Sequence, residues 1–264
     1  MRCALVQLFA IVVCVVLFDV VLLDRTARQP CPTTESLQDD LIELAGRLPE
    51  ARTTKLLTIG RAYGTDKVTR HAYHRPYGLF LDRPPQKILE IGISQGASIK
   101  TWLAYFPEAE VHGMDLHDSR RNWGIADGRF QKWIGSMTNR TFLRWFVQQH
   151  GQTFDLIIDD GARNSNQVAW EELFGPALRD GGMYIIEDVG EGYQKNGPKV
   201  DATTQVAKQW IDVIHSQYGG QKRATSPYLT GIGADEDIEG MWVSDQFILL
   251  RKRIGGPVRN ALDS

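Results

Sequence analysis

The chain has 264 residues, of which 42% are hydrophobic and 23% are charged, with a formal net charge of −2 and three cysteines. The near-zero charge argues against a nucleic-acid-binding protein, which would show a basic excess. So few cysteines cannot staple a chain of this length with disulfides, and the composition is too apolar for a wholly disordered protein. These properties favour one large α/β domain with a substantial buried core.

The N-terminus contains a long apolar stretch, Cys3–Leu23, interrupted by the polar residues Gln7 and Asp19. Its length suits one helical crossing of a bilayer, which takes about 20 residues. The segment Leu8–Phe18 also has the length of a signal-peptide core, but no cleavage motif of small residues follows it. We therefore predict an uncleaved transmembrane signal anchor in residues 1–28, and a secreted protein if this segment is cleaved.

Two signals bear on the orientation of this anchor. Arg2 lies on one side of the apolar stretch, and Arg25 and Arg28 lie on the other, so the positive charges nearly balance. The sequence Asn139–Thr141 is a glycosylation sequon, which is usable only in a lumen. We expect a single-pass membrane protein whose main domain lies in the lumen of the ER or Golgi.

Residues 29–80 are expected to form a linker and a helical cap. Pro30 and Pro32 stiffen the linker. Leucines at three- and four-residue steps then predict an amphipathic helix over Thr33–Glu50. A second, shorter helix is predicted over Lys55–Tyr63.

From Lys87 onward, short apolar runs that suit buried strands alternate with helical segments. The predicted strands are Lys87–Ile93, Glu110–Leu116, Arg129–Gly135, Phe154–Asp160, Met183–Val189 and two near Arg223–Leu229 and Val243–Arg251, and the predicted helices are Ala97–Phe106, Asn139–His150, Asn166–Arg179 and Asp201–Tyr218. This alternation predicts a doubly wound, Rossmann-like, mostly parallel sheet. It would occupy residues 81–254 and leave a short tail, 255–264.

A glycine-containing turn, Glu90–Gly96, follows the first predicted strand. Gly92 and Gly96 allow the backbone to approach a ligand, and the helix that follows offers free N–H groups. The spacing is neither that of the dinucleotide motif nor that of a nucleotide P-loop. Asp115 ends the next strand, where an acidic residue can accept hydrogen bonds from ribose hydroxyls. Together these features predict an adenosine-containing ligand, the alternative being a purely structural turn.

Two pairs of acidic residues end the later strands, Asp159-Asp160 and Glu187-Asp188. Ligands bind beyond the carboxyl ends of strands in such sheets, and carboxylates that converge there repel one another unless a positive charge lies between them. Mg²⁺, which prefers oxygen ligands, would satisfy this arrangement. The alternative is a carboxylate cluster satisfied by backbone N–H groups and by lysine or arginine.

Five motifs resemble a family of class I S-adenosylmethionine-dependent methyltransferases, in the branch of metal-dependent macrolide-sugar O-methyltransferases. The motifs are Gly64–Lys67, His71–Tyr73 with Tyr77, Ile88–Gly92, Ile158–Gly161 and Gly181–Asp188. The resemblance runs from about Gly64 to Tyr193. It implies a seven-stranded sheet whose last strand is antiparallel, with S-adenosylmethionine as cofactor.

The resemblance also implies roles for individual residues. Gly92 and Gly96 would cradle the methionine part of the cofactor, and Asp115 would hold the ribose. Further cofactor-binding positions would be Tyr73, Glu90, Ser98, Ser136 and Asp159, and Mg²⁺ would be bound by Asp160, Glu187 and Asp188. The metal would chelate two neighbouring sugar hydroxyls and lower the pKa of the attacking one. The methyl group would then pass from the sulfonium to that oxygen.

Two positions depart from the family pattern. Arg163 stands where the family has a histidine base, and arginine stays protonated at neutral pH. Ser136 stands where the family has an aspartate on the adenine side. His71 or His74 could replace the base, Arg163 could grip an anionic substrate, or the chain could be a degenerate member that binds a ligand without turnover.

We assign catalytic roles to Arg163 and His71. We predict an O-methyltransferase, Mg²⁺-assisted, that acts on a hydroxyl of a glycan, a glycosylated metabolite or another small molecule. The alternative is a catalytically degenerate ligand-binding protein on the same fold.

Overall fold

The computed structural model describes residues 43–118, 124–161, 166–194, 197–198, 203–216 and 237–255. The chain divides into two compact units, Met1–Ala45 and Gly46–Ser264, and the second contains every element below. The predicted anchor, the linker, most of the helix Thr33–Glu50 and the strand near Arg223–Leu229 fall outside the described residues. None of the helices in the described ranges combines the length and the apolar character that a membrane crossing requires.

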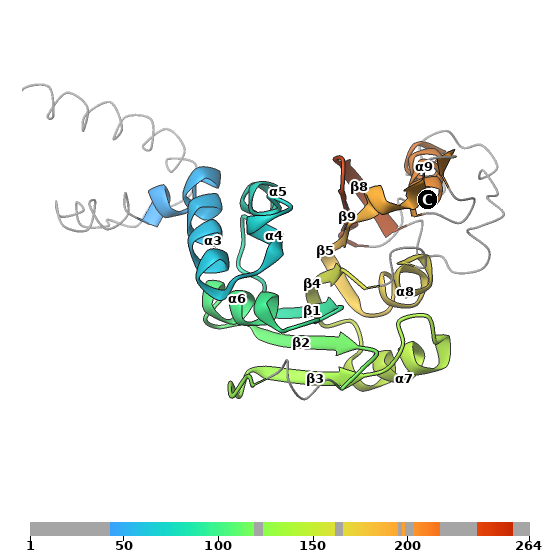
Figure 1. Ribbon diagram of the computed structural model, residues 1–264. Coiled ribbons are helices and arrows are strands. Elements are labelled where there is room, and N and C mark those ends of the chain that lie inside the picture. The colour runs from blue at the N-terminus through green and yellow to red at the C-terminus, as the bar shows by residue number, and fades with distance from the viewer. Residues whose placement is uncertain are drawn as a thin grey trace, which may run out of the picture. The chain divides into compact units, whose positions relative to one another are not determined.

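Seven strands form one sheet in the order β3-β2-β1-β4-β5-β9-β8 (Figure 1). They are β1 Lys87–Ile91, β2 Glu110–Asp115, β3 Phe130–Ile134, β4 Phe154–Asp159, β5 Leu178–Glu187, β8 Ile238–Val243 and β9 Phe247–Lys252. The first five are parallel, and β9 is antiparallel to both of its neighbours, β5 and β8. This confirms the predicted mostly parallel sheet with an antiparallel last strand. The strand order reverses between β1 and β4, which is where such sheets bind ligands.

Helices cover both faces of the sheet. They are α3 Pro49–Tyr63, α4 Asp66–Thr69, α5 His74–Phe80, α6 Ala97–Tyr105, α7 Arg140–His150, α8 Asn166–Leu173 and α9 Thr203–Ser216, and the short segments η1 Val189–Gly192, β6 Tyr193–Gln194 and β7 Gly197–Pro198 follow β5. One core packs α3, α5 and α6 against the sheet around Tyr77 and Trp102. The other packs α7, α8 and α9 against the opposite face around Phe146, Trp170 and Trp210 (Figure 1).

Several predicted boundaries are wrong, among them the start of the second helix, which lies at Pro49 and not at Lys55. The helix predicted to end at Glu50 does not, because a new helix, α3, begins at Pro49, and proline is well tolerated at the first helical position. The helix predicted to reach Arg179 ends at Leu173, and β5 begins at Leu178 and continues through two glycines with an irregular register. The single strand predicted at Val243–Arg251 is a hairpin of β8 and β9.

Candidate active site

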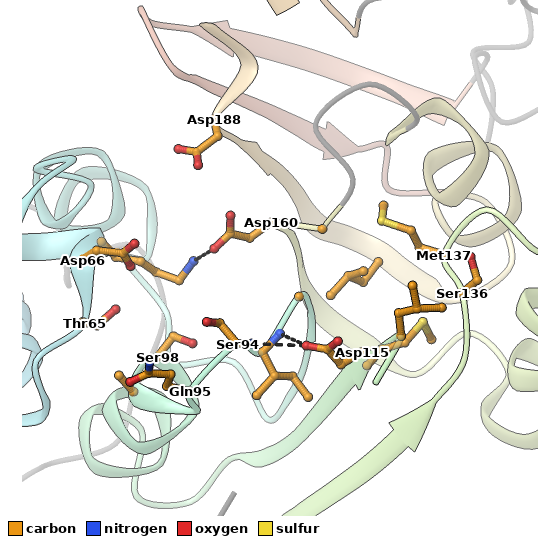
Figure 2. Close-up of a pocket in the computed structure, with 18 of the residues that line it drawn as sticks. Thr65, Asp66, Ser94, Gln95, Ser98, Asp115, Ser136, Met137, Asp160 and Asp188 are labelled. Atoms are coloured by element: carbon orange, nitrogen blue, oxygen red, sulfur yellow. Dashed lines mark hydrogen bonds and ion pairs between the residues drawn. The ribbon is translucent and has the colours of Figure 1, made fainter. Parts of the chain in front are cut away.

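A cavity of about 710 Å³ lies at the carboxyl ends of the parallel strands. That volume is in the range of small-molecule and cofactor sites. Its walls come from Gly64–Lys67, from the turn between β1 and α6, from the ends of β2 and β3, and from the residues that follow β4 and β5. Figure 2 shows Asp115 and Ser136 at one end of this cavity and Asp160 and Asp188 at the other.

The turn between β1 and α6 depends on Gly92. Its φ is +86°, which favours glycine, and a Cβ added there would lie 2.3 Å from the backbone oxygen of Asp160. Gly92 therefore lets the turn approach the β4 backbone while it also lines the cavity. Gly96, with φ +73°, is the N-cap residue before α6, and Ser94, two residues earlier, also has a positive φ of +49°. Backbone strain of this kind collects at functional sites.

Asp115 ties the end of β2 to this turn. Its Oδ2 accepts hydrogen bonds from the backbone N–H groups of Ile93 and Ser94 at 2.9 and 3.2 Å, and its Oδ1 accepts one from the His117 N–H at 3.2 Å. Each carboxylate oxygen can accept more than one bond, so Asp115, which lines the cavity, keeps capacity for a ligand hydroxyl. Ser136 lines the same end, and its Oγ lies 2.8 Å from Thr138 Oγ1.

A lysine lies among the carboxylates at the other end. Lys67 Nζ donates to Asp160 Oδ2 at 2.6 Å and to Glu187 Oε2, and it lies 3.2 Å from Glu90 Oε1. The residue is only 3% exposed. Burial lowers the pKa of Lys67, but Asp160, Glu187 and Glu90 together raise it well above its usual value. A carboxylate cluster satisfied by lysine is the predicted alternative to a magnesium site. The contacts of Lys67 agree with that alternative in part.

Aromatic side chains complete this acid cluster, which we define as Glu90, Asp160, Glu187 and Asp188. Tyr77 donates to Glu187 Oε1 at 2.6 Å, and Tyr73 donates to Asp188 Oδ1 at 2.7 Å. The indole of Trp102 donates to Glu90 Oε2 at 2.8 Å. Burial raises the pKa of Glu187 to about 8 against the opposing effect of Lys67. Asp188 itself has a φ of +56°.

Four of the predicted cofactor-binding residues do not line the cavity, namely Tyr73, Glu90, Gly96 and Asp159. Glu90 and Asp159 are fully buried, and Asp159 accepts a hydrogen bond from the Tyr184 hydroxyl at 2.9 Å. The Tyr73 hydroxyl is directed at Asp188. These side chains therefore support the cavity wall, whereas Ser98 lies on the wall itself, as Figure 2 shows.

The predicted magnesium ligands do not form a three-carboxylate cage. Within the described ranges, no group of three histidine, cysteine or acidic residues is placed to hold a metal ion. Asp160 and Asp188 both line the cavity, and 28% of the Asp160 side chain is exposed. Glu187 is 2% exposed, and Tyr77 and Lys67 each bind one of its oxygens. Of the three predicted ligands, only Asp160 and Asp188 therefore reach the cavity, where a magnesium ion would enter.

The predicted bases lie at the edge of this cluster or away from it. His71 stacks on the Tyr73 ring at 5.2 Å, and its Nδ1 lies 3.1 Å from Gln246 Oε1 and 3.5 Å from Asp188 Oδ1. His74 is buried outside the cavity wall, and burial lowers its pKa. Arg163 falls outside the described residues.

Sequence reasoning assigned no role to Lys67 and Tyr77, although both belong to the motifs. The sequence did contain a signal for Lys67. It is a positively charged residue in one of the family motifs, whereas the predicted metal ligands in the other motifs are acidic. Its target was not visible, since Lys67 meets Asp160 and Glu187 across 93 and 120 residues of chain.

No protein-family model matches the chain. Over 122 residues the chain is 36% identical to the 8-demethyl-8-(2-methoxy-alpha-L-rhamnosyl)-tetracenomycin-C 3'-O-methyltransferase of Streptomyces olivaceus. The match covers 43% of this chain and 30% of that protein. Over 159 residues the chain is 35% identical to the L-olivosyl-oleandolide 3-O-methyltransferase of Streptomyces antibioticus. This match covers 54% of this chain and 40% of that protein. The chain thus spans less than half the length of these two relatives.

Among solved structures, the chain is similar to the MycE methyltransferase of the mycinamycin biosynthetic pathway in complex with Mg and SAH. The TM-score is 0.65 at 25% sequence identity, and the match covers 75% of this chain and 54% of that one. These similarities confirm the predicted resemblance to class I methyltransferases of the macrolide-sugar O-methyltransferase branch.

Proposed function

We propose that the chain is an S-adenosylmethionine-dependent O-methyltransferase that acts on a sugar hydroxyl of a glycosylated small molecule or glycan. The observation that carries the proposal is the cavity itself. Asp115, bound to the glycine turn, lies at one end, and the cavity-facing carboxylates Asp160 and Asp188 lie at the other. Relatives that methylate sugar hydroxyls support the choice of acceptor.

Residues of the first end would bind the cofactor. S-adenosylmethionine supplies an electrophilic methyl group on a sulfonium. Asp115 accepts hydrogen bonds from the ribose hydroxyls, and Ser136 contributes a weaker polar contact beside it. The N-terminus of α6, with Ser98, faces the carboxylate of the methionine part, because helix N-termini favour negative charge. Gly92 and Gly96 hold the turn in the shape that these contacts require.

Residues of the second end would hold the acceptor and a divalent cation. Asp160 and Asp188 would hold Mg²⁺, which places positive charge beside the acceptor hydroxyl and favours its deprotonated form. The hydroxyl would give its proton to a base, and its oxygen would bond to the methyl carbon while the bond from that carbon to the sulfonium sulfur breaks. S-adenosylhomocysteine would leave as a neutral thioether. We propose His71 as that base, oriented by Gln246, because it lies beside Asp188 and a base must be within reach of the proton it removes. We propose that Arg163 binds an anionic or polar group of the acceptor.

A ligand-binding protein without turnover is the second candidate. The observation that favours it is the position of Lys67, which binds two acids of the predicted metal set. Together with Arg163 in place of the usual histidine, this arrangement is compatible with a site that has lost its chemistry.

Calorimetric titration of the full chain with S-adenosylmethionine tests the first part of the proposal. Asp115→Asn should weaken binding about tenfold, because a charge-assisted hydrogen bond to the ribose is lost. Asp118→Asn, an exposed change outside the cavity, is the control. Absence of cofactor binding to the unchanged chain would exclude the enzyme.

Methyl transfer to a panel of deoxysugar glycosides, with and without Mg²⁺, tests the second part. Asp160→Asn should abolish turnover. Arg163→His should raise turnover if the arginine marks a lost base, and should harm acceptor binding if the arginine grips an anion. Cofactor binding without transfer to any acceptor would favour the second candidate.

We also propose that residues 1–28 anchor the chain and that the main domain, residues 81–254, faces the ER or Golgi lumen. The apolar stretch Cys3–Leu23 and the exposed sequon residue Asn139 support this. The Asn139 side chain accepts a hydrogen bond from the Phe142 N–H and caps α7. In lumen-containing cells, Asn139→Asp should therefore keep the cap and remove a glycosidase-sensitive mass shift. A chain without that shift that is recovered with soluble proteins would contradict the proposal.

A further inference from the structure

We propose that Lys67 is a positioning residue that acts as a tethered cation inside the acid cluster. It occupies the closed end of the cluster and thereby limits how strongly a divalent cation binds at the open end, beside Asp160 and Asp188. The inference rests on the proposed function in one respect, namely that a divalent cation binds at this site.

The geometry places the Lys67 ammonium between three strands. Glu90 lies on β1, Asp160 follows β4, and Glu187 ends β5, while Lys67 comes from α4 in front of the sheet. Its Nζ lies 2.6 Å from Asp160 Oδ2 and 3.2 Å from Glu90 Oε1, and it also donates to Glu187. Figure 2 shows the bond to Asp160 as a dashed line. A lysine ammonium is a compact charge with three donors, and three carboxylates surround it here.

Burial separates the two ends of the cluster. The Glu187 side chain has no exposed surface, and its two oxygens bind Tyr77 and Lys67. Asp160 differs, since its Oδ2 binds Lys67 while part of its side chain faces the cavity. A cation that enters the cavity therefore meets Asp160 and Asp188, whereas Glu187 is already bound.

The Lys67 ammonium and an incoming divalent cation would compete for Asp160. Asp160 binds Lys67 and would also bind the incoming cation, so the two positive charges would lie within a few ångströms of each other. Such repulsion is substantial at the effective dielectric of a partly buried site. If the ammonium is removed, three carboxylates are left without a counter-ion, which is costly in a buried position. A divalent cation would then relieve that cost and bind more tightly.

Titration of the full chain with MgCl₂, without cofactor or acceptor, tests the inference by calorimetry and by the Mg²⁺-dependent shift in Tm. Lys67→Met should bind Mg²⁺ at least about tenfold more tightly than the unchanged chain, since repulsion from the ammonium is gone. Its Tm should also rise more on addition of Mg²⁺. Lys67→Arg, which keeps the charge, should bind like the unchanged chain.

Lys252→Met is the matched control. Lys252 is 2% exposed and donates to the Leu178 carbonyl at 2.8 Å, outside the acid cluster. Its loss should lower Tm without a change in Mg²⁺ affinity. Equal or weaker Mg²⁺ binding by Lys67→Met, or the same tightening in Lys252→Met, would overturn the inference.

Two further variants decide the matter if Lys67→Met does not fold. Asp160→Asn should weaken Mg²⁺ binding about tenfold or more, whereas Glu187→Gln should change it by less than roughly threefold, because its carboxylate is not available to the ion. Equal losses in both variants would overturn the inference.

These titrations distinguish failure of the inference about Lys67 from failure of the proposed function. Binding of Mg²⁺ by Lys67→Met but not by the unchanged chain would support the inference and contradict metal assistance. Absence of S-adenosylmethionine binding would contradict the enzyme without affecting the metal titration.

Discussion

The two ends of the cavity hold their carboxylates by different means. Asp115 is held by backbone N–H groups of a turn on the neighbouring strand. Glu187 and Asp188 are held by Lys67, Tyr73 and Tyr77, which come from segments in front of the sheet and meet them across 110 to 120 residues of chain. The sheet itself therefore builds the first end. The second end forms only when α4 and α5 dock on the sheet, so its geometry depends on that docking.

The largest expected effect concerns the end that the sheet builds. Gly92→Ala should destabilise the protein by roughly 2–4 kcal/mol, from an unfavourable φ and a contact with the Asp160 carbonyl. It should weaken cofactor binding roughly a hundredfold, because a displacement of about an ångström matters at a preorganised site. Denaturant unfolding and calorimetry measure the two effects.

Gly64→Ala separates the two causes of that instability. Gly64 has a φ of +73°, but a Cβ there would meet nothing within 4 Å. Its loss should cost about 1 kcal/mol, the conformational part alone. Equal destabilisation by the two changes would mean that the close approach of the turn to β4 contributes nothing.

A polar cluster around His112, on the strands β2 and β3, should make the free energy of unfolding depend on pH. His112 is fully buried; its Nε2 lies 2.7 Å from Glu110 Oε1, and its Nδ1 accepts a hydrogen bond from the Trp133 indole at 3.0 Å. That acceptor role requires a neutral ring. Burial lowers the pKa of His112 to about 4, with Lys87 and His150 acting in the same direction and Glu110 opposing them.

The sign of this pH dependence follows from proton uptake. Between the folded value of about 4 and the ordinary value of 6.5, the unfolded chain binds more protons at His112 than the folded one. The contribution of His112 to the free energy of unfolding is therefore fully present above pH 6.5. It falls by about 3 kcal/mol as the pH drops to 4. Urea unfolding across this range should show the loss, and His112→Gln should flatten it, whereas the His117→Gln control should not.

The last comparison sets a hydrogen bond between a helix and the sheet against a hydrogen bond within the sheet. Tyr77→Phe and Tyr184→Phe each remove one hydrogen bond to a buried carboxylate, Glu187 and Asp159 respectively. Each should cost about 1–3 kcal/mol. Only Tyr77→Phe should also speed hydrogen exchange in α3–α5, because Tyr77 lies on α5, whereas Tyr184 and Asp159 both lie on strands of the sheet. Equal exchange in the two variants would contradict the dependence of the second end on the docking of α4 and α5.

The sheet and the first end of the cavity follow from local patterns. The apolar runs of β1 and β4 are buried throughout because both faces of the sheet are covered, and Asp115 ends a strand as its position predicts. The role of Lys67 could not be predicted, since no spacing relates it to Glu187. The bounds of α8 and β5 were also missed, because the sheet extends β5 through Gly181 and Gly182, residues that disfavour strands.

The backbone of Asp188 has a consequence for how this site can change over time. At a φ of +56°, aspartate, asparagine and glycine are the residues that fit with little strain. Of these, only aspartate carries a charge. One substitution, Asp188→Asn, would therefore remove a negative charge from the wall of the cavity and leave the main chain as it is. A methyl-transferring ancestor and a silent descendant could thus share a nearly identical shape, and residue 188 is where we would look first to distinguish them.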